Sequence, residues 1–246
     1  TTNLVATLLA SGGVTLPGAP QNYGVLTQGG SAVSRTFCFT ANGICGGTIT
    51  PVFQLQDGAR NLGTVTFGLT LGVATPFQVM AQDFDGVVAP DLPAGWTSSV
   101  TESGIAWVAS TAQADSLPNA VFAANPDAVS DCWLLSPSVT IDSTGAQLTF
   151  RHRYDMEDGS DGGVLEISID GGVFTDLLDA GGSFVTNGYN RTLSSYYQNP
   201  LAERQAWSGN SGGFVTTVVN LPAAAVGVNV QLRWRLGSDN STGAAG

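Results

Sequence analysis

Apolar and polar residues alternate with a period of two along much of this chain. The alternation is clearest in two segments: Leu148, Phe150, His152 and Tyr154 alternate with Thr149, Arg151 and Arg153, and Val230, Leu232, Trp234 and Leu236 alternate with Asn229, Gln231, Arg233 and Arg235. This pattern is typical of antiparallel strands that bury one face and expose the other. No segment has a convincing helical period, although residues 201–206 would tolerate a short helix. We therefore expect an all-β fold.

The first third of the chain has the same period. One face of a predicted strand would carry Val33, Arg35, Phe37 and Phe39, and one face of another would carry Val65, Phe67, Leu69 and Leu71. The turn-forming segments Asn42-Gly43, Asp57-Gly58, Asp161-Gly162 and Asp170-Gly171-Gly172 separate such runs along the chain.

A break in the pattern near Thr75-Pro76 predicts two domains. Five or six short strands precede the break, and a new strand-like segment begins at Phe77 and is followed by all five tryptophans. We expect an Ig-like β-sandwich over residues 1–74 and a larger jelly-roll β-sandwich over residues 77–246.

Composition and charge narrow the classes of partner. The chain is 43% hydrophobic and only 11% charged, which is not the composition of a disordered chain. Its formal net charge is −11, from 19 acidic residues against 8 basic ones that are all arginine. Nucleic-acid binding draws on clustered cations, so we expect none. No apolar run reaches about 18 residues, so we also expect no membrane span.

Cysteine spacing suggests an oxidising compartment. Cys38 and Cys45 flank the turn-forming residues 41–44, and we expect a disulfide between them. A strict two-residue hairpin would make Cys38 only a diagonal neighbour of Cys45, about 7–8 Å away between Cα atoms, so the bridge requires a looser turn. Cys132, beside Trp133, is expected to be a small buried apolar residue.

The second predicted domain resembles a known family through an ordered series of motifs. These are Asp83-Phe84-Asp85-Gly86, Leu92-Pro93-Ala94-Gly95-Trp96, Trp133-Leu134-Leu135-Ser136-Pro137, Phe150-Arg151-His152, residues 161–172, residues 209–213, Leu232-Arg233-Trp234-Arg235 and Gly237-Ser238-Asp239. They are similar to MAM-like and cleaved-adhesin modules, including the C-terminal module of immune-inhibitor-A-like secreted metallopeptidases. The first domain resembles Ig-like repeats that precede such modules in large secreted bacterial proteins. The resemblance implies a jelly roll, an extracellular location, frequent Ca²⁺ and an adhesive or substrate-docking role.

The chain departs from this family near its end. In the family, the Gly-Ser-Asp segment is followed by a Gly-Trp-aromatic-Ile-Asp-Asp strand, which is lacking before Gly246. A sandwich without that strand exposes backbone groups that can pair with another chain. Either the chain is a truncated product, or a segment of a neighbouring copy fills the edge and builds a head-to-tail filament. Residues 1–9 are one possible donor, although we favour them as the first strand of their own domain.

Calcium is the cofactor that the residues favour, because it prefers oxygens from carboxylates and loop carbonyls. The resemblance implies an early acidic ligand at Asp85, and Asp239 lies near the end of the chain. A second acidic run comprises Asp155, Glu157, Asp158 and Asp161. This run does not follow the EF-hand pattern. The alternatives are a solvated acidic turn for the run and simple turn capping for Asp85.

Three tyrosines are candidates for binding a ligand by stacking. Tyr189, Tyr196 and Tyr197 lie in a segment rich in Gly, Asn and Ser, where exposed aromatic rings could stack on sugars. The alternative is that these rings pack against the sandwich.

Residues 209–213 have the composition of the nucleophile loop of chymotrypsin-like proteases, with Ser211 at the centre. A catalytic triad also needs a base and an orienting acid. The single histidine, His152, shares its face with Phe150 and Tyr154 and is therefore expected among core side chains. One histidine also cannot assemble the usual zinc ligand sets. A glycosidase needs only two carboxylates, but no pair stands out. We expect no enzymatic activity.

Together these patterns predict a secreted structural or adhesive protein, with any signal peptide already removed. It would associate with copies of itself by strand pairing or strand donation, as in a homopolymeric filament. The alternative is a non-catalytic carbohydrate- or substrate-docking module of a larger secreted hydrolase, which would bind cell-surface or matrix glycans.

Overall fold

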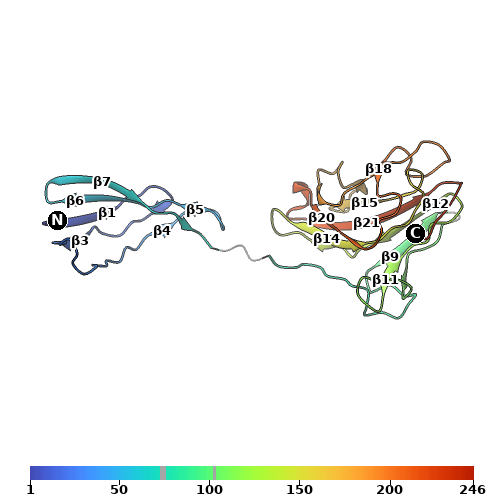
Figure 1. Ribbon diagram of the computed structural model, residues 1–246, viewed down its shortest axis with the longest axis horizontal. Helices are drawn as coiled ribbons and strands as arrows, with labels where there is room; N and C mark the ends of the chain where they lie inside the picture. Colours follow the sequence, from blue (N-terminus) through green and yellow to red (C-terminus); the bar gives the residue numbers. More distant parts are fainter. Residues whose placement is uncertain (73–75, 102–103) are drawn as a thin grey trace. The chain divides into compact units, whose positions relative to one another are not determined.

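The computed structural model describes residues 1–72, 76–101 and 104–246 (Figure 1). Apart from one short 3₁₀ helix, η1 (Ala223–Ala225), the regular elements of these residues are β-strands, so the predicted all-β class is confirmed. The chain divides into two compact units, Thr1–Phe77 and Gln78–Gly246. Of the boundary expected at Thr75-Pro76, Thr75 lies outside the described residues. None of the described helices is long and apolar enough to cross a membrane.

The first unit is built on a four-stranded antiparallel sheet in the order β3-β1-β6-β7. Its strands are β1 (Leu4–Leu8), β3 (Gln21–Gly24), β6 (Val52–Asp57) and β7 (Arg60–Thr66); short ladders join β2 (Val14–Thr15) to β4 (Thr40–Ala41) and β5 (Thr48–Ile49) to β8 (Leu69–Thr70). Because β1 pairs with β3 on one side and β6 on the other, it is a strand of its own unit and not a free donor (Figure 1). That the unit is Ig-like stays a prediction.

The strand predicted around residues 33–39 does not form. Its side chains make other contacts: the ring of Phe37 lies 4.9 Å from that of Phe53, and Arg35 Nε donates to the carbonyl of Asn22 at 2.9 Å. The alternating pattern was present, but a strand also needs a neighbouring backbone with free hydrogen-bonding groups. Only the end of the pattern, from Thr40, enters a ladder.

The predicted strand over residues 63–71 is divided between β7 and β8. Val65, Phe67 and Leu69, which were expected on a buried face, are exposed. Val65 lies in β7, the end strand of its sheet, and Leu69 lies in the two-stranded ladder of β5 and β8, whereas Phe67 lies between these strands.

The disulfide expected between Cys38 and Cys45 does not form, and both thiols are free and exposed. Asn42-Gly43 is not a hairpin turn here, since β4 pairs with the distant β2. The carbonyl of Cys38 accepts the N–H of Gly18, whereas the residue after Cys45 donates its N–H to Leu71, so the two cysteines have different neighbours. Cys132 is buried as expected, and burial raises the pKa of its thiol to about 12.

The second unit contains a broad and a narrow antiparallel sheet. The broad sheet has the order β16-β15-β21-β12-β9, with β13 also paired to β21, and the narrow sheet has the order β14-β20-β17. The strands are β9 (Thr97–Thr101), β12 (Ser130–Leu135), β13 (Val139–Thr140), β14 (Gln147–His152), β15 (Gly162–Ile169), β16 (Thr175–Asp176), β17 (Ser183–Thr186), β20 (Val215–Asn220) and β21 (Asn229–Ser238). Short ladders join β10 (Val108–Ser110) to β11 (Ala120–Phe122) and β18 (Arg191–Thr192) to β19 (Gln205–Ala206).

The main core combines side chains from both sheets of the second unit. Leu165 and Leu232 of the broad sheet pack in one buried cluster with Val219 of the narrow sheet. The alternation predicted for β14 is confirmed, because its apolar positions are the less exposed ones. On the other face of the broad sheet, Leu193 and Leu201 pack with Val164 in a second cluster, which anchors the long segment between β17 and β20.

His152 lies in the aromatic part of the core, as its position on β14 predicts. Its ring centroid is 4.8 Å from that of Trp207 and 4.9 Å from that of Phe150. Its Nε2 lies 2.9 Å from the hydroxyl of Thr217, which donates its own hydrogen to the carbonyl of Asn187 at 2.9 Å. Because a hydroxyl has one hydrogen, Nε2 is the donor and the other ring nitrogen carries no proton. Burial lowers the pKa of His152 to about 4.

This histidine predicts a loss of stability in acid. Below pH 6.5, its ordinary pKa, the unfolded chain binds a proton that the folded chain does not accept until about pH 4, so the free energy of unfolding falls through this window. We expect His152 to account for a loss of up to about 3 kcal/mol. His152→Gln should remove that part of the decline in urea unfolding at pH 7.5 and pH 4.5. Equal declines in the two proteins would contradict the assignment.

Candidate metal centre

Three of the predicted acidic ligands meet where two central strands of the second unit end. Asp161 directly precedes β15, and Asp239 directly follows β21. The two strands pair with Gly162 opposite Gly237, so the residue before one strand lies beside the residue after the other. Glu157 is in the turn that leads into β15. We call Glu157, Asp161 and Asp239 the acidic triad.

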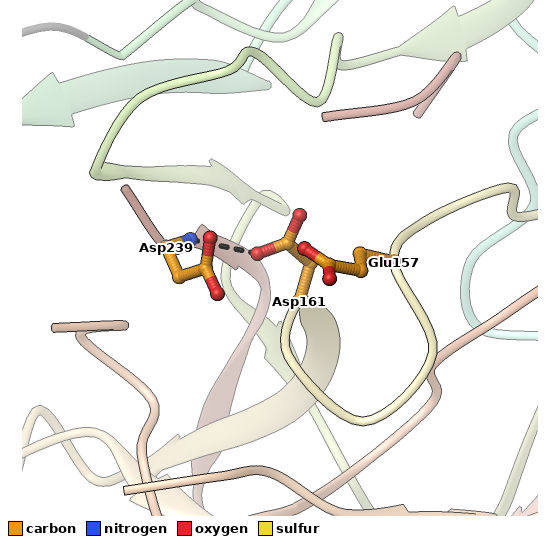
Figure 2. Close-up of side chains that lie close together, drawn as sticks. All are labelled: Glu157, Asp161 and Asp239. Carbon is orange, nitrogen blue, oxygen red and sulfur yellow. Dashed lines mark hydrogen bonds between the residues drawn. The ribbon is translucent and has the colours of Figure 1, made fainter. Parts of the chain in front are cut away.

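The carboxylates of the acidic triad face one another (Figure 2). One ligand oxygen from each lies within 4.8 Å of the other two. The backbone N–H of Asp239 donates to Asp161 Oδ1 at 2.7 Å, which fixes the end of β21 against the start of β15. Both the N–H and the hydroxyl of Ser241 lie 2.7 Å from Asp239 Oδ1, and the same hydroxyl lies 2.8 Å from Glu157 Oε2.

A buried serine shapes the turn that carries two of the three acids. The hydroxyl of Ser208 lies 2.6 Å from the carbonyl of Asp161 and 3.1 Å from that of Glu157, and it accepts the N–H of Gly159 at 2.8 Å. The N–H groups of Ser160 and Asp161 both donate to the carbonyl of Glu157. These contacts close the turn and direct its acidic side chains toward β21.

Two oxygens of the acidic triad have no hydrogen-bond partner among the described residues. Asp161 is 0% exposed and Asp239 is 1% exposed, yet the Oδ2 atom of each is unpaired. Buried polar atoms in folded proteins are almost always paired, and a buried charge without a partner is strongly unfavourable. These two atoms therefore point to a missing positive partner.

The pKa of Asp161 also indicates that a negative charge is unfavourable at this position. Burial raises the pKa of its carboxyl to about 7, and the negative charges of Asp239 and Glu157 add to this effect, while the N–H donated by Asp239 opposes it. A carboxyl with so high a pKa is only partly ionised near neutral pH, and a bound cation would restore its charge.

The same sheet deals differently with another buried carboxylate. Glu166 on β15 is 2% exposed, and it forms ion pairs with Arg204, Arg233 and Arg235. None of the ion pairs found among the described residues involves a member of the acidic triad. The second unit therefore neutralises the buried Glu166 with its own arginines, but none of the ion pairs among its described residues does the same for the acidic triad.

The acidic triad fits a calcium ion. Oxygens bound to Ca²⁺ lie about 2.3–2.6 Å from the ion, so any two of them are at most about 5 Å apart. The three carboxylates satisfy that limit, and they offer the hard oxygen ligands that Ca²⁺ prefers. Calcium usually takes six to eight oxygens. Carboxylates that bind through both oxygens, together with waters, would complete that number.

Two of the predicted metal ligands are not part of the acidic triad. Asp85 accepts the backbone N–H of Asn119 at 2.9 Å and so caps a neighbouring segment. Asp155 accepts the side-chain amide of Asn210 at 2.7 Å, and its backbone pairs with Gly246. In both cases a protein donor already occupies one carboxylate oxygen.

Two of the predicted tyrosines lie on the surface next to the acidic triad. Tyr196 is 74% exposed and Tyr197 is 57% exposed, and their ring centroids are 6.3 Å apart. They belong to residues 194–199, which we call the tyrosine loop. The carbonyl of Tyr197 accepts the N–H of Asn240 at 3.0 Å, directly after Asp239 of the triad.

The prediction that Tyr189 is an exposed residue for ligand stacking is wrong. Its hydroxyl accepts the N–H of Leu165 at 2.9 Å and lies 3.1 Å from a carboxylate oxygen of Asp176, while its ring packs on Phe184 and Trp207. Burial raises the pKa of this phenol. The sequence around Tyr189 is that of a loop, but its hydroxyl joins the edge of the broad sheet and its ring completes the core.

The structure also does not bring Ser211 and His152 together as a serine-protease site would require. The hydroxyl of Ser211 lies 2.9 Å from the carbonyl of Gly213 and 3.2 Å from that of Tyr154, and it accepts the N–H of Tyr154 at 3.0 Å. His152 bonds to Thr217 instead. The serine and the histidine are therefore not a nucleophile and its base.

Two residues at the site were missed by the sequence reasoning. Ser208 and Ser241 hold the turn and the segment after β21, but single serines in Gly-rich segments are too common to be noticed. The only available signal was position, since Ser241 lies two residues after Asp239 and can reach back to its carboxylate.

Comparisons with known proteins assign the chain to no family. No family model matches the chain, and no curated protein does so either. A solved structure described as "Structural basis for the promiscuous specificity of the carbohydrate-binding modules from the beta-sandwich super family" is similar, with a TM-score of 0.40 and 12% identity over 99% of this chain and 81% of that chain. The resemblance to MAM-like and cleaved-adhesin modules therefore stays a prediction.

The acidic triad predicts that one substitution has opposite effects with and without metal. With a chelator present, Asp161→Asn should raise the melting temperature by roughly 2–8 °C, because it removes a buried charge beside two others. In millimolar Ca²⁺, the wild type should gain stability that the variant does not. Differential scanning calorimetry of both proteins, with Asp155→Asn as the control, tests this. A wild type that melts at the same temperature with and without Ca²⁺ would count against a metal centre.

Proposed function

We propose that the second unit is a non-catalytic docking module for carbohydrate that works outside the cell and is stabilised by Ca²⁺. The observation that carries the proposal is the exposed pair Tyr196 and Tyr197 beside an acidic triad in which the buried Asp161 and Asp239 each have an unpaired oxygen. The tyrosine pair supports docking, and the triad supports a bound cation that holds the surrounding loops.

The tyrosine pair suits a sugar ligand for a physical reason. The flat, apolar faces of pyranose rings pack on aromatic rings, while the phenol hydroxyls can hydrogen-bond to sugar hydroxyls. Large apolar side chains that stay exposed next to each other often mark an interaction surface. Polar side chains that could contact a sugar lie in the same loop at Ser195 and Gln198, both of which are exposed.

The charge of the unit also agrees with a neutral ligand. Of the 19 acidic residues and 8 arginines in the chain, 18 and 6 lie in residues 78–246, a net charge of −12 for this unit. Such a surface repels polyanions, whereas uncharged glycans are unaffected by it. A surface rich in carboxylates is also compatible with surroundings that contain millimolar Ca²⁺, as outside cells.

The tyrosine pair yields a direct test. In a glycan array run with Ca²⁺, we expect the wild type to bind one or more neutral oligosaccharides, and Tyr196→Ala or Tyr197→Ala to weaken that binding by about tenfold. Calorimetric titration with the best oligosaccharide would measure the loss. Phe67→Ala, which removes an equally exposed aromatic ring from the first unit, is the matched control. Wild-type binding that both tyrosine variants retain would place the ligand elsewhere.

A second candidate function is assembly of copies by strand pairing, and the free edge of β14 favours it. In the described part of the chain, β14 pairs only with β20. Just beyond β14, Asp155 and Gly246 exchange two backbone hydrogen bonds, at 3.1 and 2.9 Å. Such an exchange is a hydrogen-bonded antiparallel pair. An extended segment is thus already accepted at one end of this edge.

The rest of the edge has the groups that a further strand would need. Successive residues of a strand alternate in the direction of their N–H and C=O groups, so Thr149, Arg151 and Arg153 direct theirs to the same side as Asp155. An extended segment of a neighbouring copy could continue the ladder there, and repetition would build a filament.

Electron microscopy and sedimentation at high protein concentration test this assembly. We expect fibres or large oligomers from the wild type and monomers from Thr149→Pro, because proline removes an N–H on the free edge and spares the ladder with β20. Thr149→Val, which keeps the N–H, is the control. A wild type that stays monomeric at high concentration would rule the assembly out.

A further inference from the structure

Hydrogen bonds tie the tyrosine loop to the two segments that carry the acidic triad. The N–H of Ser194 donates to the carbonyl of Gly159 at 2.8 Å, in the turn between Glu157 and Asp161. At the other end of the loop, the side-chain amide of Asn199 donates to the carbonyl of Ser160 at 2.7 Å and to that of Gly237 at 3.0 Å. Asn199 is itself buried.

The backbone of the loop needs these attachments. Tyr197 and Gln198 have φ angles of 68° and 66°, in the left-handed region that side chains disfavour. Two such residues in succession persist only where surrounding contacts hold them. The N–H of Asn240, which binds the carbonyl of Tyr197, is one of those contacts.

The same two segments carry the charges that repel one another. Asp161 belongs to the turn and Asp239 to the segment after β21, and their unpaired Oδ2 atoms are buried together. A cation between them attracts both segments, whereas its loss leaves the repulsion between the carboxylates, opposed by the N–H that Asp239 donates to Asp161. Every contact of the loop described above lies within two residues of a triad member.

We infer that cation binding at the acidic triad holds the tyrosine loop in place, so that glycan docking through Tyr196 and Tyr197 is calcium-dependent. The glycan part of this inference rests on the proposed function, whereas the ordering of the loop does not. In this arrangement, the bound metal ion positions the tyrosine loop for docking and does not itself contact the sugar.

Backbone hydrogen exchange, measured by NMR with Ca²⁺ alone as the ligand, tests the ordering. The amides of Ser194, Leu201 and Asn240 are hydrogen-bonded within or to the loop. Adding saturating Ca²⁺ should slow their exchange by about tenfold or more in the wild type. The same slowing should occur in Asp155→Asn, which leaves the triad intact, and should be absent in Asp239→Asn.

A second variant separates metal binding from loop ordering. Asn199→Ala cuts the amide link but leaves the triad, so calorimetry should still detect Ca²⁺ binding while the slowing at Ser194 is lost. Unchanged exchange in a wild type that calorimetry shows to bind Ca²⁺ would overturn the inference, as would failure to bind Ca²⁺ at all.

Glycan binding provides the last comparison. An oligosaccharide found on the array should bind the wild type at least about tenfold more weakly with a chelator present than with Ca²⁺. Equal binding in both conditions would overturn the calcium dependence and leave the proposed function standing. Loop ordering by Ca²⁺ without binding of any glycan would instead refute the docking function and leave the ordering intact.

Discussion

The antiparallel pairing of β15 with β21 is the constraint on which the candidate site depends. Because Gly162 lies opposite Gly237, Asp161, directly before Gly162, and Asp239, two residues after Gly237, are brought together inside the protein. Backbone hydrogen bonds along both strands hold that register and keep Asp161 and Asp239 close together, although both acids lie just beyond the ends of the ladder. The fold thus keeps two like charges close to each other, and a cation is the simplest agent that makes the arrangement favourable.

The treatment of Glu166 shows why this conclusion is specific to the acidic triad. On β15, the carboxylate of Glu166 is about as deeply buried as those of Asp161 and Asp239, but it is surrounded by guanidinium groups. Its pKa is lowered by its hydrogen bonds to Arg204 and Arg233 despite the opposing effect of burial, whereas that of Asp161 is raised. Glu166 lies on β15 and Asp161 directly precedes the strand, and the two are similarly buried. Within the described part of the chain, only Glu166 of these two forms ion pairs with arginines, so burial alone does not explain the unpaired oxygens.

Period-two patterns predicted β14 and β21 because each strand has a buried and a wetter face, which the sequence records directly. They failed for residues 33–39, since alternation says nothing about whether a partner backbone is available. The sequence identifies the acidic residues as candidate ligands. Which of them come together depends on the register of the strand pairing, which brings Asp239 to Asp161 and not to Asp85. That register cannot be read from the spacing of residues in the sequence. Tyr189 failed for a similar reason: its loop-like neighbours hide the fact that its hydroxyl binds the backbone of Leu165.

Residues 239–246 connect the two candidate functions physically. This segment leaves the acidic triad at Asp239, donates from Gly243 to a carboxylate oxygen of Asp127, and reaches the edge of β14, where Gly246 pairs with Asp155. It has no strand of its own, so its position depends on these few contacts. A cation at the triad would anchor its first residue and thereby favour the pairing at its last. The proposed docking through the tyrosine loop and the proposed strand pairing at β14 would therefore use different surfaces but depend on the same anchor.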